Sequence, residues 1–321
     1  MRYLVTLTPL EPFLFGGDTT FGKKGDEEKG TYLVKSRQFP QQSAVLGMLK
    51  KEIMTQSGVL TRKVRGEWVD KQKKKEAEAL VGVEKFDIGS EGLQDFGIIK
   101  SLGSIFLIQE QKQYIKKVDI DSYTYKDGLL ESYNPEIDIY DNFVETKTSE
   151  KLSSGDIFKP IEQTGNKTGG EDDSLFKKTS YLLKYDFKFA FYLECEYELR
   201  DSIIHLGADR SSFKLEIRED NDSLEYSDEN GYLTLMSDAY ITLPIKEHCV
   251  FAITSEISFQ SLQNKKHATK SNAFQKSTKI FLYEKGSVFI NPSDELVKNL
   301  NNKNCQRIGY NKHTYEKGQN R

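Results

Sequence analysis

The segment FPQQSAVLGMLKKEI, residues 39–53, decides the fold, because it has the features of a helix start that follows a strand and a glycine-containing loop. Residues 2–8 alternate as a buried strand does, and a glycine pair follows them. Ser43 is a suitable N-cap, and apolar residues then recur at helical spacing, which predicts a helix over residues 42–56. The free N–H groups and the dipole of such a helix start attract phosphate.

The composition indicates a two-domain protein without a membrane segment. A length of 321 residues favours two domains over one, and we place them at residues 1–200 and 201–321. No window approaches the apolar length that spans a membrane, and the N-terminus lacks the apolar core of a signal peptide. Three widely spaced cysteines indicate a reducing compartment without a disulfide framework. We therefore expect a cytoplasmic protein with no membrane partner.

Charge is segregated into local runs, although the whole chain carries only −3. Residues 62–75 hold seven cations and two carboxylates, and residues 298–321 hold six cations and one carboxylate, so each run has a net charge of +5. Residues 216–229 hold seven carboxylates and one arginine, a net charge of −6. Two interpretations stay open: these runs are solvated faces, or they form a basic track and an acidic, partner-facing edge.

Periodicity predicts many short strands and few helices. Because strands outnumber helices, we expect an α+β fold with two ferredoxin-like (RRM-like) domains, antiparallel sheets and long insertions, rather than a parallel doubly wound sheet. The individual assignments are a mobile insertion over 57–92, a hairpin with strands at 105–108 and 114–118, a loop or extended hairpin over 145–178, a helix over 246–262, a hairpin with strands at 279–283 and 287–290, and a capped helix over 293–300.

The sequence offers no motif for metal binding, nucleophilic catalysis or a cofactor. It contains no CxxC, HExxH or GxSxG pattern and no strict phosphate-binding glycine motif. His205, Asp209 and Ser211 lie close together, but a tight turn at Gly207, capped by Asp209 or Ser211, accounts for that spacing. We therefore expect no metal ion and no cofactor, and we expect that the chain is not an enzyme.

Three short segments have the residue types that hold single-stranded RNA. Such RNA is bound by aromatic stacking, by amide and hydroxyl contacts and by a basic track. Each segment combines a turn or a helix start with hydrogen-bond donors, and Tyr310 is a candidate stacking ring. The segments are residues 39–43, 210–212 and 309–313.

Several short patches, in order along nearly the whole chain, resemble the RAMP superfamily of CRISPR systems. More narrowly, the chain resembles subunit three of the type III-B Cmr effector complex, a member of the Cas-five-like group. The patches are residues 8–15, 39–53, 96–100, 117–119, 206–210, 285–289 and 309–310.

The resemblance implies two ferredoxin-like domains and a non-catalytic role in an antiviral ribonucleoprotein. In that role the chain binds the 5′ repeat-derived handle of the crRNA, and it meets target RNA only indirectly. The implied protein partners are the large polymerase-like signalling subunit and the first backbone RAMP subunit. The expected RNA-binding residues are Arg37, Gln41, Gln42, Ser43, Lys50, Gly207, Arg210, Ser211, Gly309, Tyr310, Asn311 and Lys312.

Two other functions stay open. A metal-independent endoribonuclease that processes the guide-RNA precursor needs a general acid or base, for which His205, His313 and Tyr310 are the candidates. A purely protein-binding scaffold uses the runs at 62–75 and 216–229 as docking surfaces.

Overall fold

The computed structural model describes residues 1–315 except 17–18, 22–31, 62, 65–66, 84, 91, 121–122, 127–128, 132–133, 135–137, 168–173, 228–231, 261, 265–273 and 277. The fold is α+β with several antiparallel sheets, as expected. Arg62 and Arg65 of the first basic run, Asp228 and Glu229 of the acidic run and residues 316–321 of the second basic run lie outside the described residues.

The largest sheet is antiparallel and has the strand order β12-β11-β8-β7-β15-β1-β17-β16, with β6 also paired to β15. Strand β1 lies in its centre, and Leu4 pairs with Tyr192 of β15 and with Arg218 of β17. The strands are β1 (Arg2–Pro9), β6 (Ile99–Leu102), β7 (Phe106–Gln109), β8 (Lys112–Lys116), β11 (Asn142–Glu145), β12 (Lys151–Ser153), β15 (Lys188–Cys195), β16 (Ser202–Leu206) and β17 (Ser211–Glu219).

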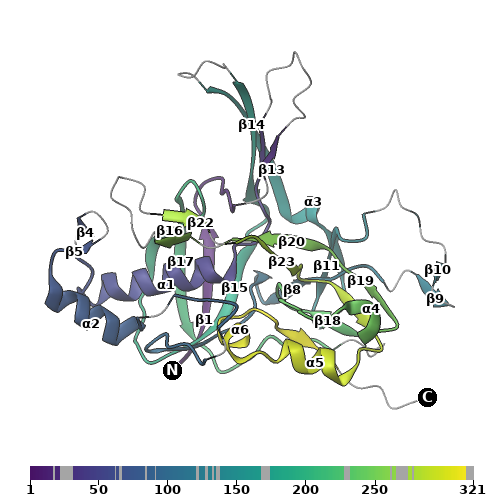
Figure 1. Ribbon diagram of the computed structural model, residues 1–321. Coiled ribbons are helices and arrows are strands. Elements are labelled where there is room, and N and C mark those ends of the chain that lie inside the picture. Colours follow the sequence, from purple (N-terminus) through teal and green to yellow (C-terminus); the bar gives the residue numbers. More distant parts are fainter. Residues whose placement is uncertain are drawn as a thin grey trace.

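Helix α1 (Gln42–Gln56) covers one face of this sheet and confirms the predicted helix (Figure 1). Its Val45, Leu49 and Ile53 are fully buried in the main hydrophobic cluster, together with Leu7 of β1 and Phe189 of β15. The N-cap is Gln41, two residues before the expected Ser43. The Gln41 side chain makes no capping hydrogen bond.

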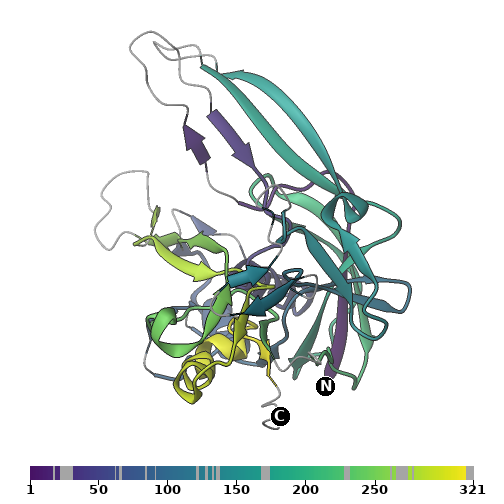
Figure 2. The ribbon, with the colours of Figure 1, turned by 90° about the vertical axis from the view of Figure 1, so that its right-hand side faces the viewer.

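A second sheet, with the order β13-β14-β3-β2, projects from the body as a long arm (Figures 1 and 2). Its strands are β2 (Thr19–Phe21), β3 (Tyr32–Lys35), β13 (Phe158–Lys167) and β14 (Ser174–Leu183). Strands β13 and β14 confirm the extended hairpin expected within residues 145–178, although β14 runs beyond that range. Strand β3 is parallel to β14, so the arm is joined to the segment that enters α1.

The C-terminal part forms a smaller antiparallel sheet with the order β19-β24-β18-β25. Helices α5 (Asp294–Leu300) and α6 (Lys303–Arg307) lie between β24 and β25 in the chain, and Ser293 caps α5 as expected. The strands are β18 (Leu233–Leu235), β19 (Phe251–Ile253), β24 (Val288–Ile290) and β25 (His313–Thr314).

The remaining elements of the described residues are three helices and four small ribbons. Helix α2 (Lys71–Val81) packs beside α1, and α3 (Ser154–Ile157) and α4 (Ile245–His248) are single turns. The ribbons are β4 (Lys63–Val64) with β5 (Glu67–Trp68), β9 (Thr124–Lys126) with β10 (Leu129–Glu131), β20 (Glu256–Phe259) with β23 (Ile280–Tyr283), and β21 (Leu262–Asn264) with β22 (Phe274–Lys276). Within the described ranges, no helix is long and apolar enough to cross a membrane.

Three local predictions are wrong. The 57–92 insertion contains the capped helix α2, in which only Ala77 and Val81 are buried, so the helix gives little periodic signal. Residues 246–262 are mostly β19 and β20, and only their first turn is helical. Strands β23 and β24 do not pair with each other: β23 pairs with β20, and β24 pairs with β18 and β19.

The first sheet extends past residue 200. Strands β16 and β17 follow that residue, and β17 pairs with β1 over seven positions, from Tyr3↔Glu219 to Pro9↔Phe213. Along the chain, the largest sheet ends with β17 and the C-terminal sheet begins with β18. The change from one sheet to the other therefore falls between β17 and β18 rather than at the expected 200/201 boundary.

Candidate nucleic-acid interface

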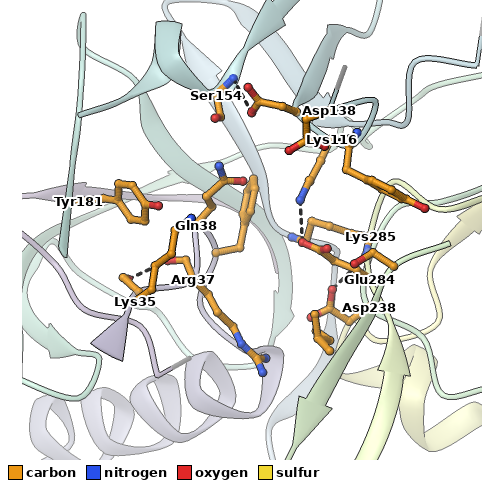
Figure 3. Close-up of a pocket in the computed structure, with 16 residues that line it drawn as sticks. Lys35, Arg37, Gln38, Lys116, Asp138, Ser154, Tyr181, Asp238, Glu284 and Lys285 are labelled. Carbon is orange, nitrogen blue, oxygen red and sulfur yellow. Dashed lines mark hydrogen bonds and ion pairs between the residues drawn. The ribbon is translucent and has the colours of Figure 1, made fainter. Parts of the chain in front are cut away.

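A cleft of about 470 Å³ lies where the end of strand β3 meets the C-terminal sheet. Figure 3 shows Lys35, Arg37 and Gln38 on one side, and Lys116, Asp238, Glu284 and Lys285 on the other. The first group comes from the segment that leads into α1. The second group comes from β8, from the segment after β18 and from the turn before β24.

Hydrogen bonds hold the segment on the β3 side of the cleft in place. The Ser36 N–H donates to Thr179 O (2.8 Å) of the arm, and the Ser36 hydroxyl accepts from Phe15 N (2.8 Å). The same hydroxyl donates to Arg37 O (2.8 Å). Arg37 then reaches across to the C-terminal part, where its Nη2 donates to Ser258 O (2.5 Å).

The opposite side is built around a buried lysine. The Lys285 ammonium donates to Ile105 O (3.0 Å) and lies 3.7 Å from the centre of the Phe39 ring. Its backbone N–H donates to Asp238 Oδ1 (3.0 Å). Burial lowers the pKa of Lys285 to about 8 and raises the pKa of Asp238. The next residue, Gly286, has a φ of +86°, and a Cβ there would lie 2.9 Å from Lys116 O, so the close approach of the two parts requires glycine.

Some charged side chains of the cleft have hydrogen-bond or ion-pair partners in the protein, and others have none among the described residues. Lys116 forms an ion pair with Glu284 (2.6 Å). Asp138 and Asp141 accept backbone hydrogen bonds from Tyr140 (3.0 Å) and Ser154 (3.0 Å). By contrast, the buried Arg37 Nη1 has no acceptor among the described residues.

Lys35 is exposed at the mouth of this cleft, and no described residue pairs with its ammonium group. Lys35 and Arg37 therefore supply two cationic donors to the cleft that no described residue uses. Guanidinium and ammonium donors of this kind suit phosphate or carbonyl oxygens.

The structure brings together two of the predicted segments, residues 39–43 and 309–313. Their contact covers the N-terminus of α1, which was expected to bind phosphate. Tyr310 is fully buried, and its hydroxyl donates to Ser43 Oγ (3.3 Å) and accepts from Ser43 N (3.4 Å). The ring stacks on Phe86 at 5.4 Å. Burial raises the pKa of Tyr310. The Tyr310 hydroxyl thus occupies the position at which a phosphate would meet α1, and its ring is not accessible to a base.

The predicted RNA-binding residues next to Tyr310 also make contacts within the protein. Gln42 is buried, and its Nε2 donates to Gly103 O (3.3 Å). Gly309 has a φ of +87° and packs against Gln42. Asn311 is fully buried, and its Oδ1 accepts from Tyr240 N (2.8 Å). Gln41, the N-cap, is half-buried at the edge of this group.

The other predicted residues lie apart from the cleft. Gly207, Arg210 and Ser211 form the turn between β16 and β17, where Arg210 is exposed and the Ser211 hydroxyl donates to Pro12 O (3.1 Å). Lys50 places its ammonium 4.9 Å from the centre of the Phe96 ring. Lys312 lines a different cleft, beside Arg2, and burial lowers its pKa.

The candidate acid–base residues of a ribonuclease are separated. His205 is exposed on β16, and its Nδ1 lies 3.2 Å from Arg210 O. His313 belongs to β25 in the other sheet, and burial lowers its pKa. Within the described residues, no group of three or more His, Cys, Asp or Glu side chains has the arrangement of a metal site.

Lys35, Lys116, Asp238 and Lys285 line the cleft but were not among the predicted site residues. Two signals were available, since Lys35 lies two residues before Arg37 and Lys285 begins the patch 285–289, but contacts between distant segments bring the four residues together.

Comparisons with known proteins identify the fold but not a family. No family model matches the sequence. No curated protein matches it either. A chain in a cryo-EM structure of the type III-B Cmr-beta bound to cognate target RNA matches with a TM-score of 0.54 and 13% identity, over 98% of this chain and 96% of that chain.

Two further solved structures match along most of the chain. A chain of the same assembly bound to cognate target RNA and AMPPnP has a TM-score of 0.52, 13% identity and coverage of 98% and 96%. A chain of the Csm3-Csm4 subcomplex in the type III-A CRISPR-Cas interference complex has a lower TM-score of 0.38, with 11% identity and coverage of 91% and 92%. The two Cmr-beta matches show that this chain has their fold over nearly its full length.

Proposed function

We propose that this chain is a non-catalytic, RNA-holding subunit of a type III CRISPR effector complex. The observation that carries the proposal is the full-length structural likeness to a chain of the RNA-bound Cmr-beta structure. The sequence patches that resemble the third subunit of the Cmr complex favour the same position in the assembly. The proposed ligand is the 5′ handle of the crRNA, and the proposed neighbours are the large signalling subunit and the first backbone subunit.

The strand order supports a duplicated ferredoxin-like architecture for this role. In the largest sheet, the four strands β1, β7, β15 and β17, named in chain order, lie in the spatial order β7-β15-β1-β17, and α1 follows β1. In the C-terminal sheet, β18, β19, β24 and β25 lie in the equivalent order β19-β24-β18-β25, with α4 after β18 and α5 and α6 after β24. Both sheets therefore have the strand order of a split βαβ unit.

Within this proposal, the cleft between the two units is one part of the RNA seat. Lys35 and the Nη1 of Arg37 supply donors that have no protein acceptor among the described residues. A phosphate or a base carbonyl would accept from both, and it would satisfy the buried Nη1 of Arg37, since an unpartnered buried donor is unfavourable. The exposed turn at Arg210 is a second contact, and the helix start contributes through the rim at Gln41 rather than through Tyr310.

The test is binding of handle-containing RNA by a Lys35→Gln/Arg37→Gln variant. The matched control is Lys147→Gln/Arg218→Gln, which removes the same charge from exposed positions elsewhere. We expect the cleft variant to lose about tenfold or more in affinity, since it removes two charge-assisted contacts. Equal affinities for the two variants, with both folded by circular dichroism, would remove the cleft from the RNA seat.

A further inference from the structure

Helix α2 begins with a dense group of lysines. Lys71, Lys73, Lys74 and Lys75 lie within the first five positions of this 11-residue helix, and its first turn has no acidic residue. The Asp70 side chain caps the helix by accepting from the backbone N–H groups of Gln72 (2.9 Å) and Lys73 (3.0 Å). Because Asp70 already accepts from these backbone N–H groups, the lysine side chains are the groups of this helix start that can bind a ligand.

This charge arrangement does not serve the stability of the helix. Cations near the N-terminus oppose the helix dipole. The two ion pairs of α2, Lys73–Glu76 (3.7 Å) and Lys74–Glu78 (3.4 Å), place lysine before glutamate, which is the less favourable order. Local departures of this kind from the rules of helix design occur mainly at functional positions.

The lysines face outward. The buried residues of α2 are Ala77 and Val81, whereas Lys71 and Lys75 are exposed and lie four positions apart, so they share one exposed side of the helix, away from the buried pair. No described residue pairs with the ammonium group of either one. Since the whole chain carries −3, this patch does not result from a generally basic composition.

We infer that the outward face of α2, formed by Lys71 and Lys75, binds the phosphate backbone of single-stranded RNA. Ammonium groups on flexible stems contact phosphates as point charges and do not read bases, so binding here is independent of sequence. Helix α2 lies beyond α1 at the edge of the molecule (Figure 1), whereas the cleft lies between the two units, so the α2 face is a second RNA contact beyond the proposed function.

The position of the single tryptophan allows this surface to be tested directly. Trp68 ends β5, three residues before Lys71, and it is half-buried. A titration of the full chain with fluorescently labelled poly-uridine RNA is followed by two signals, the anisotropy of the label and the emission of Trp68. RNA on the α2 face changes both signals, whereas RNA bound only in the cleft changes only the anisotropy.

The variant is Lys71→Gln/Lys75→Gln, and the matched control is Lys147→Gln/Lys246→Gln, which removes the same charge at exposed positions on other elements. Losing two phosphate contacts lowers the slope of log affinity against log salt by about 1.4, which corresponds to about 25-fold weaker binding near 0.1 M salt. The unfolding midpoint of the α2 variant stays equal to that of the wild type or rises, because fewer cations oppose the helix dipole.

Three results would overturn the inference. Trp68 emission could stay constant while the RNA anisotropy saturates, which rejects the α2 face but leaves the cleft proposal intact. The control and the α2 variant could lose affinity equally, which assigns the effect to total charge. The salt slope could be the same in both variants, in which case an acidic protein is the better partner for these lysines.

Discussion

The Lys285 ammonium lies 3.7 Å from the centre of the Phe39 ring, and this contact joins the turn before β24 to the segment that enters α1. The same ammonium donates to Ile105 O (3.0 Å). Lys285, which lies in the C-terminal part, therefore contacts both Phe39 before α1 and Ile105 before β7. It also lines the cleft that is proposed to hold RNA. Its charge state affects the junction itself.

The junction should make stability depend on pH. Burial lowers the pKa of Lys285 from 10.5 to about 8, so between these values the unfolded chain binds a proton that the native chain has lost. Stability therefore rises with pH in this window, by up to about 1.4 kcal/mol per pH unit, and this contribution is lost as pH falls through about 8. Urea denaturation of wild type and Lys285→Met between pH 7.5 and 9.5 measures the effect, which the variant should lack. Parallel curves would contradict it, and Lys147→Met controls for removal of an exposed lysine.

The contact between Tyr310 and Ser43 should be structural. Tyr310→Phe removes both hydrogen bonds of the hydroxyl and should lower the free energy of unfolding by about 1 kcal/mol, while Tyr310→Ala should lower it by about 3–5 kcal/mol. Chemical denaturation followed by circular dichroism measures both. If Tyr310→Ala keeps wild-type stability, the ring is not a core residue and its availability for base stacking must be reconsidered.

The glycine before Tyr310 offers a sharper comparison. A Cβ at Gly309 would lie 2.4 Å from Gly103 O, and its φ is +87°, whereas a Cβ at Gly47 in α1 meets no atom within 4 Å. Gly309→Ala should therefore destabilise the fold by about 1–3 kcal/mol through backbone strain. Gly47→Ala should stabilise it by up to about 1 kcal/mol through helix propensity. Thermal unfolding of the two variants would contradict the described packing if their shifts had the same sign.

The chain should not cleave RNA. His205 and His313 lie in different sheets, and Tyr310 is buried, so the described structure does not place a general acid and a general base from this set around one phosphate. Incubation of the purified chain with repeat RNA in EDTA should leave the RNA intact on a denaturing gel. Cleavage that disappears in His205→Ala or His313→Ala would support the ribonuclease alternative instead.

Sequence patterns predicted those elements whose stability is local. Helix α1 has a full apolar stripe, and α5 has Ser293 as its cap, so both were predictable. Helix α2 was missed because only Ala77 and Val81 are buried in it. The pairing of β23 and β24 with different partners could not be read from the chain, because a short turn between two strands is normally a hairpin.

The candidate site was less predictable than the fold. Arg37 was predicted and lines the cleft, but the hydrogen bond between Ser43 and Tyr310 joins residues 267 positions apart. Tyrosine beside glycine and lysine is a pattern shared by RNA-binding loops and by core turns, so residue type alone does not separate the two. Burial decides it here, since Tyr310 has no exposed surface.

The proposed role in a type III effector complex can be tested directly by purifying the tagged chain from its native host and identifying the proteins and RNAs that come with it. We predict recovery of a type III effector assembly, including a large signalling subunit and a backbone subunit, together with small RNAs that share a repeat-derived 5′ end. Recovery of the chain without such RNA, or with an unrelated set of proteins, would contradict it.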